Sequence, residues 1–96
     1  MKTSPRHRFR LYVAGESPHS ATARRNLREL CAQCLADDYE IECIDVLVDP
    51  ARALRDGVFI TPTVVRVAPQ PSRPVIGNLS QRETVLNALG LLPIAS

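Results

Sequence analysis

The first half of the chain alternates a strand pattern, an amphipathic helix and a second strand, and this constrains its fold most. Apolar and polar side chains alternate over residues 8–13. Ser17 and Pro18 suit a helix start, and one apolar stripe follows them: Ala23, Leu27, Leu30, Cys31, Cys34 and Leu35. Residues 40–48 form the second strand, more apolar towards its end, as in a strand covered on both faces. We therefore predict a parallel βαβ unit.

The second half of the chain shows shorter patterns. Residues 51–56 suit a short helix that ends at Gly57. Strands over 64–67 and 73–76 flank a turn rich in proline, and Pro74 favours an edge position for the second of them. A pair of antiparallel strands is therefore expected after the short helix.

A last helix completes the pattern, with Ser80 and Glu83 as its capping box and Gly90 as its end. The element order predicts a single α/β domain with the thioredoxin-like arrangement βαβ-α-ββα over residues 1–96, with an ordered core from about 8 to 92. Thr61-Pro62-Thr63 lies where that fold places a cis-proline, so we expect a cis Thr61–Pro62 bond.

The one CxxC pair, formed by Cys31 and Cys34, suggests a redox site at first sight. A redox CxxC places its first thiol at a helix N-terminus, where backbone N–H groups and the helix dipole stabilise the thiolate. In the predicted fold that place is the turn over residues 15–18, which holds no cysteine. Because Cys31 and Cys34 fall on the apolar stripe, we expect them in the core. A thioredoxin-like thiol oxidoreductase that uses them is the alternative.

No other set of residues in the sequence indicates a catalytic or metal site, so we expect no catalytic residue, metal or cofactor. A zinc site needs four ligands, or three and a water, but His19 starts the first helix, roughly 18 Å of helix rise from Cys31. The sequence has no Gly-rich phosphate loop, nucleophile elbow or HExxH motif. These features favour a protein that acts by binding a partner.

Charge and composition restrict the partner and the compartment. The net charge of +2 is too small to indicate nucleic acid, and 4% aromatic residues offer few rings for base stacking. The basic start leads into only a short apolar run, residues 11–15, whereas a membrane span needs about 20 apolar residues. Three cysteines do not suggest an extracellular disulfide framework. We predict a cytoplasmic protein with no nucleic-acid or membrane partner.

Several short motifs follow one another along the chain from about residue 9 to 92. They are Leu11-Tyr12-Val13-Ala14-Gly15 with Ser17-Pro18-His19-Ser20, Ile44-Asp45-Val46-Leu47 with Asp49-Pro50, Thr61-Pro62-Thr63, and Val75-Ile76-Gly77-Asn78-Leu79-Ser80 with Arg82-Glu83. In order and spacing they resemble the motifs of the KaiB family of circadian clock proteins. Each motif is weak by itself, whereas the ordered set is specific.

The resemblance implies a non-enzymatic protein that binds the KaiC ATPase ring and regulates its phosphorylation cycle. It also implies a homodimer or homotetramer in a different ground-state fold, which keeps the first βαβ unit and rearranges the second half. The partner-binding candidates are Arg25, Asp49, Arg52, Arg55, Asp56 and Gly57. The fold-switch candidates are Thr61, Pro62, Thr63, Gly77 and Asn78.

Two positions depart from the family pattern. Many relatives carry Asp where this chain has Asn78, and Lys where it has Gly57. These departures indicate a paralogous or non-cyanobacterial member, linked to a clock or to stress signalling. A sensor-type interaction domain, like the one in the related clock histidine kinase, is a further interpretation.

Overall fold

The computed structural model describes residues 5–91 of the chain, so residue 92 of the expected core lies outside the described part. Its elements are β1 (His7–Val13), α1 (Pro18–Leu35), β2 (Tyr39–Asp45), α2 (Pro50–Arg55), β3 (Thr63–Ala68), β4 (Val75–Ile76) and α3 (Arg82–Leu89). The predicted element order, βαβ-α-ββα, is confirmed. No helix within residues 5–91 is long and apolar enough to cross a membrane.

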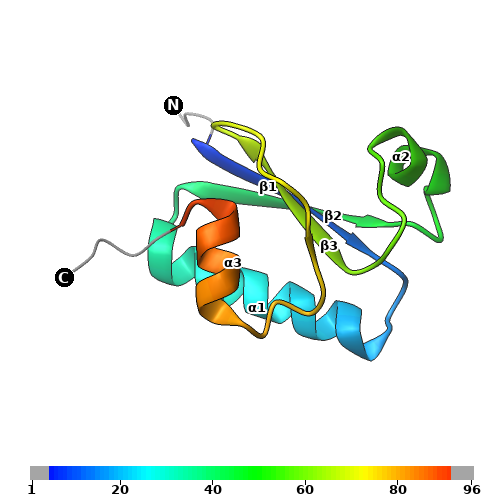
Figure 1. The fold of residues 1–96 in the computed structure, drawn as a ribbon, viewed down its shortest axis with the longest axis horizontal. Helices are drawn as coiled ribbons and strands as arrows, with labels where there is room; N and C mark the ends of the chain where they lie inside the picture. The colour runs from blue at the N-terminus through cyan, green and yellow to red at the C-terminus, as the bar shows by residue number, and fades with distance from the viewer. Residues whose placement is uncertain (1–4, 92–96) are drawn as a thin grey trace.

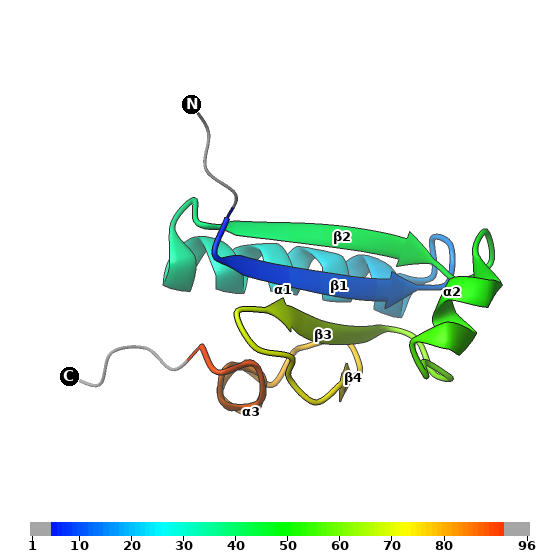
Figure 2. The ribbon, with the colours of Figure 1, turned by 90° about the horizontal axis from the view of Figure 1, so that it is seen from above.

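The four strands form one sheet in the order β2-β1-β3-β4 (Figure 2). β1 and β2 are parallel, as the βαβ prediction requires, while β3 runs antiparallel to β1 and β4 antiparallel to β3. Helices α1 and α3 cover one face of the sheet, and α2 lies beyond the opposite face at one end (Figure 1). Much of that second face therefore has no helix over it.

The main core lies between the sheet and the two helices α1 and α3. Alternate β1 side chains point into it, because successive residues of a strand face opposite sides. They pack against the α1 stripe and against α3, with these residues fully or nearly buried: Phe9, Leu11, Val13, Ala23, Leu27, Leu30, Cys31, Val64, Val85, Leu86 and Leu89. Cys34 and Leu35 are partly buried against the same cluster. The predicted stripe is confirmed.

The start of α1 is capped as predicted. Ser17 is the N-cap residue, its hydroxyl accepts a hydrogen bond of 3.3 Å from the Ser20 backbone N–H, and Pro18 is the first helical residue. The side-chain oxygen satisfies one of the N–H groups that a helix leaves unpaired at its start. The local sequence is therefore sufficient to fix this helix start.

The capping box predicted for α3 is wrong. The N-cap position is Gln81, without a side-chain cap, and the Ser80 N–H donates a bond of 3.1 Å to Asn78 Oδ1. Buried Leu79 has a left-handed φ of 64°, so the chain turns before Ser80 and the helix begins one residue too late for Ser80 to cap it. Gly90 ends α3 with a left-handed φ of 70°, as predicted.

The second strand is an edge strand and ends at Asp45 rather than at Val48. Ile44 alone of its seven residues is buried, so the prediction of a strand covered on both faces is wrong. Asp45 Oδ1 accepts a bond of 2.9 Å from the Leu47 N–H, and the Asp45 carbonyl accepts one of 3.0 Å from the Val48 N–H. These bonds turn the chain. Leu47 and Val48 are consequently exposed.

The fourth strand contains only Val75–Ile76, shorter than the predicted 73–76. The Ser72 N–H donates a hydrogen bond of 2.9 Å to the Arg66 carbonyl, and Ser72 Oγ accepts one of 2.8 Å from the Arg66 N–H. This turn occupies the chain before Pro74, which itself has no N–H to donate. The Thr61–Pro62 bond is cis, as predicted, and so is Ala68–Pro69.

Candidate partner-binding site

The segment that contains α2 exposes five large apolar side chains. Leu47 and Val48 precede the helix, Leu54 belongs to it, and Phe59 and Ile60 follow it; the exposed fractions of Val48 and Phe59 are 80% and 81%. Single exposed apolar residues are ordinary, whereas a concentration of them marks a surface for interaction. We refer to these five residues as the α2 apolar side chains.

The helix itself is short and has polar residues at both ends. Asp49 is its N-cap and accepts a bond of 3.3 Å from the Arg52 N–H, with Pro50 at the first helical position. Asp56 follows the last helical residue, and Gly57 leaves it with a φ of 73°. Local sequence thus explains where α2 begins and ends.

Beneath α2 lies a small second core on the face of the sheet opposite α1. It contains Tyr12, Ile44, Ala53 and Val58, with Val46 packed against it. Tyr12 is 1% exposed, although it alternates with the β1 residues of the main core, because α2 covers this end of the other face.

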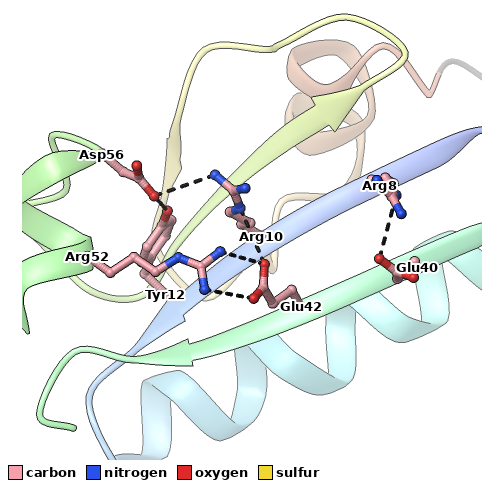
Figure 3. Close-up of polar contacts among 7 residues, drawn as sticks. All are labelled: Arg8, Arg10, Tyr12, Glu40, Glu42, Arg52 and Asp56. Carbon is pink, nitrogen blue, oxygen red and sulfur yellow. Dashed lines mark hydrogen bonds and ion pairs between the residues drawn. The ribbon is translucent and has the colours of Figure 1, made fainter. Parts of the chain in front are cut away.

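A network of polar contacts joins α2 to the sheet (Figure 3). The Tyr12 hydroxyl donates a hydrogen bond to Asp56 Oδ2, which also lies 3.5 Å from Arg10 Nη1. The Arg52 guanidinium donates two bonds of 2.8 Å to the Glu42 carboxylate, and Arg10 Nε donates a third of 3.3 Å. The network therefore links β1, β2 and α2.

The same face of the sheet carries a further charge pair next to this network. Arg8 Nε lies 3.6 Å from Glu40 Oε2, and the two residues are direct partners in the parallel register. Arg10 and Glu42 are the next such partners. Alternate positions of β1 and β2 thus form a charge ladder on the face opposite α1 and α3.

These surroundings shift the pKa values of two groups in the network. Burial, with the hydrogen bond to Asp56, raises the pKa of Tyr12 to about 12. The hydrogen bonds from Arg52 lower the pKa of Glu42. Tyr12 therefore stays a hydroxyl donor and Glu42 a charged acceptor over the physiological pH range.

The predicted partner-binding residues occupy different environments. Asp49, Arg52 and Asp56 all take part in the contacts that begin or anchor α2. Arg55 and Gly57 are exposed, and Arg55 forms no salt bridge within the described residues.

Arg25 lies on α1, away from this segment of the chain. It lines a cavity of about 320 Å³ together with Leu79, Ser80 and Arg82 at the start of α3. The structure therefore separates the predicted set into residues around α2 and one residue beside α3.

The two predicted fold-switch segments lie side by side. The Pro62 carbonyl accepts a bond of 2.9 Å from the Gly77 N–H, and Thr63 pairs with Ile76 at the start of β3. The Asn78 carbonyl accepts a bond of 2.8 Å from the Asn26 amide of α1. The structure thus brings these segments together, while their role as a switch stays a prediction.

The cysteines do not have the environment of a redox pair. Cys31 is buried, Cys34 is half-buried, Cys43 is exposed, and all three are free thiols. Burial, with the nearby Cys34, raises the pKa of Cys31 to about 12, whereas a nucleophilic cysteine needs a lowered pKa. Residues 5–91 contain no group of three or more His, Cys, Asp or Glu side chains that could hold a metal ion.

The sequence alone indicates neither the exposed apolar side chains around α2 nor the network beneath it. Its apolar pattern places Val48 in a buried strand and gives no role to Phe59 and Ile60. An available signal was the alternation of arginine in residues 6–10 and of carboxylates in 38–42, which is the pattern of two laterally paired strands.

Two solved structures are similar to this fold. Mitochondrial thioredoxin 3 from Saccharomyces cerevisiae has a TM-score of 0.72 and 18% identity, and the match covers 92% of this chain and 80% of that one. The N-terminal domain of SasA from Synechococcus elongatus has a TM-score of 0.73 and 16% identity, covering 100% of this chain and 94% of that one. The thioredoxin-like prediction is confirmed.

Sequence comparison then identifies the family. Residues 10–91 match the family model of the KaiB domain. Circadian clock protein KaiB3 from Synechocystis sp. is 39% identical over 85 residues, which are 88% of this chain and 83% of that protein. Circadian clock oscillator protein KaiB from Trichodesmium erythraeum is 43% identical over 84 residues, covering 88% of this chain and 81% of that protein. The chain therefore belongs to the KaiB family of circadian clock proteins.

Proposed function

We propose that this protein is a non-enzymatic regulator that binds a KaiC-type ATPase ring in the cytoplasm and modulates its phosphorylation cycle, in a clock or a stress pathway. Membership of the KaiB family supports the regulatory role. The observation that supports binding is the exposure of the α2 apolar side chains. Large apolar side chains gathered on a surface mark a site where a partner covers them.

The chemistry of this segment suits a contact between proteins. Phe59 and Leu54 are large and exposed, and burying them against a partner would release ordered water and contribute most of the affinity. Arg55 stands beside them, free to form a polar contact at the edge. A catalytic role receives no such support, because burial of Cys31 raises its pKa to about 12.

The proposal includes a homodimer or homotetramer and a rearrangement of the second half of the chain. Residues 61–63 and 77–78 are the proposed switch segments, and the bond from Gly77 to Pro62 is a contact that such a rearrangement would break. Two packings within a few kcal/mol would suffice. Binding to the ATPase would then be slow if the binding arrangement is a minor one.

Incubation of the purified protein with the KaiC-type ATPase of the same organism tests this function. We expect a complex in size-exclusion chromatography after long incubation, and an altered time course of ATPase phosphorylation. Phe59→Ala and Leu54→Ala should weaken the complex, whereas Arg73→Ala, an exposed substitution between the last two strands, should not. No complex with the unsubstituted protein after long incubation would overturn the proposal.

A further inference from the structure

Helix α2 has little that holds it in place apart from its polar contacts. It has six residues, and a helix that short is unstable in water unless other parts of the protein hold it. Ala53 is its one buried residue. The side chains beneath it contribute some apolar burial, but a single alanine methyl group fixes neither the direction nor the tilt of a helix.

The polar network attaches α2 to two strands of the sheet. Arg52, the third residue of the helix, makes two bonds of 2.8 Å to Glu42 of β2. Asp56, directly after the last helical residue and one turn beyond Arg52, contacts Tyr12 and Arg10 of β1. Two attachments to different strands restrict the orientation of the helix, and a two-bond arginine–carboxylate pair is directional as well as strong.

Two large apolar side chains near these attachments are exposed to solvent. Leu54 is 66% exposed and lies between Arg52 and Asp56 in the sequence, and Phe59 follows on the loop that leaves the helix. Neither contributes to the network, yet the direction in which each points depends on how α2 is held. Arg52 and Asp56 thus contact residues of the sheet (Figure 3). Leu54 and Phe59 are exposed to solvent.

We propose that Tyr12 and Glu42 are positioning residues for partner binding, which act by orienting α2 so that Leu54 and Phe59 meet the partner together. This inference rests on the proposed function, and it differs from the sequence prediction in the role of Arg52 and Asp56. They hold the surface in place rather than contact the partner. Pre-organisation of this kind raises affinity because the segment loses less conformational entropy on binding.

Matched variants separate this role from a general loss of stability. Tyr12→Phe removes only the hydroxyl that Asp56 accepts from, and Glu42→Gln removes the charge that holds Arg52. Glu40→Gln is the control, since Glu40 pairs with Arg8 in the neighbouring position of the same ladder and has no hydrogen bond or salt bridge to α2 within the described residues.

Affinity is measured with the KaiC-type ATPase of the same organism, at a temperature where every variant is folded. We expect Tyr12→Phe and Glu42→Gln to weaken binding by about threefold to tenfold, the equivalent of one hydrogen bond, and Glu40→Gln to leave it unchanged. Hydrogen exchange of the α2 amides in the free protein should become faster in the first two variants only.

A double-mutant cycle between Tyr12→Phe and Phe59→Ala provides the decisive readout. If Tyr12 acts through the apolar side chains, its substitution should weaken binding less once Phe59 has been truncated. Additive effects, or unchanged affinity of Tyr12→Phe while the wild type binds, would overturn this inference alone. Failure of the wild type to bind would instead overturn the proposed function and this inference with it.

Discussion

The Arg52 guanidinium pairs with the Glu42 carboxylate through two hydrogen bonds, with each of its terminal nitrogens 2.8 Å from a carboxylate oxygen. This arginine has only 24% of its side chain exposed. The family resemblance makes it a candidate for partner contact, yet its donors are turned toward the sheet. On a short helix, the residue type alone does not distinguish a residue that anchors the helix to the sheet from one that contacts a partner, because both functions use the same charged side chains.

Replacing the N-cap of α1 should destabilise the protein, whereas the same change before α3 should not. Ser17→Ala removes the side-chain oxygen that accepts from the Ser20 N–H, and a lost N-cap costs about 1 kcal/mol. Ser80→Ala should change stability by less than about 0.5 kcal/mol, because Ser80 does not cap α3. Urea denaturation measures both, and equal losses would show that Ser80 caps α3 in solution.

Gly90→Ala should destabilise the protein by more than the backbone conformation alone explains. Gly90 has a left-handed φ of 70°, for which alanine costs roughly 1 kcal/mol. A methyl group there would also stand 2.5 Å from Arg66 Nη1, which donates a bond of 2.8 Å to the Leu89 carbonyl. Loss of that bond should add about 1 kcal/mol. Thermal or urea unfolding measures the total.

Gly57→Ala is the matched control for this experiment. Its φ of 73° is nearly the same, but no atom lies within 4 Å of an added methyl group. The difference between the two variants therefore reports the contact with Arg66, and it should shrink in an Arg66→Ala background. Equal destabilisation by the two substitutions would show that Arg66 moves aside freely.

The three thiols should react with a thiol reagent in the order of their exposure. In the native protein, Cys43 should react rapidly, while Cys31 should react only on unfolding, since burial raises its pKa to about 12. A Cys43→Ala variant should lose the fast phase of colour development with Ellman's reagent. A fast phase that persists in this variant would contradict the core assignment of the CxxC pair.

Stability should decrease in alkali because of Tyr12. Its pKa rises from 10.0 to about 12 on folding, so between these values the folded state keeps a proton that the unfolded state has lost. The stabilisation is therefore complete below pH 10 and is lost as the pH rises towards 12. Denaturation midpoints at several pH values check this, and Tyr12→Phe should have a weaker pH dependence.

The βαβ half of the fold was predictable from the sequence because its signals are local. Alternation in β1, the apolar stripe of α1 and the Ser17-Pro18 start each need only neighbouring residues. The end of β2 was not predictable, because Val46 to Val48 continue the apolar pattern of a buried strand. A single side chain, Asp45, overrides that pattern by accepting the Leu47 N–H.

The candidate site was harder to predict because its contacts are distant in sequence. Tyr12 and Asp56 are 44 positions apart, and Arg10 and Glu42 are 32 apart. The family resemblance implies that the segment 49–57 matters, but which side chains face the sheet depends on register and on the position of α2. Neither can be obtained from local periodicity.

The charge ladder between β1 and β2 repeats every second residue, and this has a consequence for how the strands find their alignment. If β2 slid by two positions, Arg8 would again face a glutamate, in that case Glu42. The ladder favours pairing but is degenerate with respect to such a slip. Contacts that occur once, such as the Gly15 N–H with Asp45 Oδ1 at 3.1 Å, lift the degeneracy. Removing the Asp45 carboxylate should therefore allow misaligned strands to compete during folding.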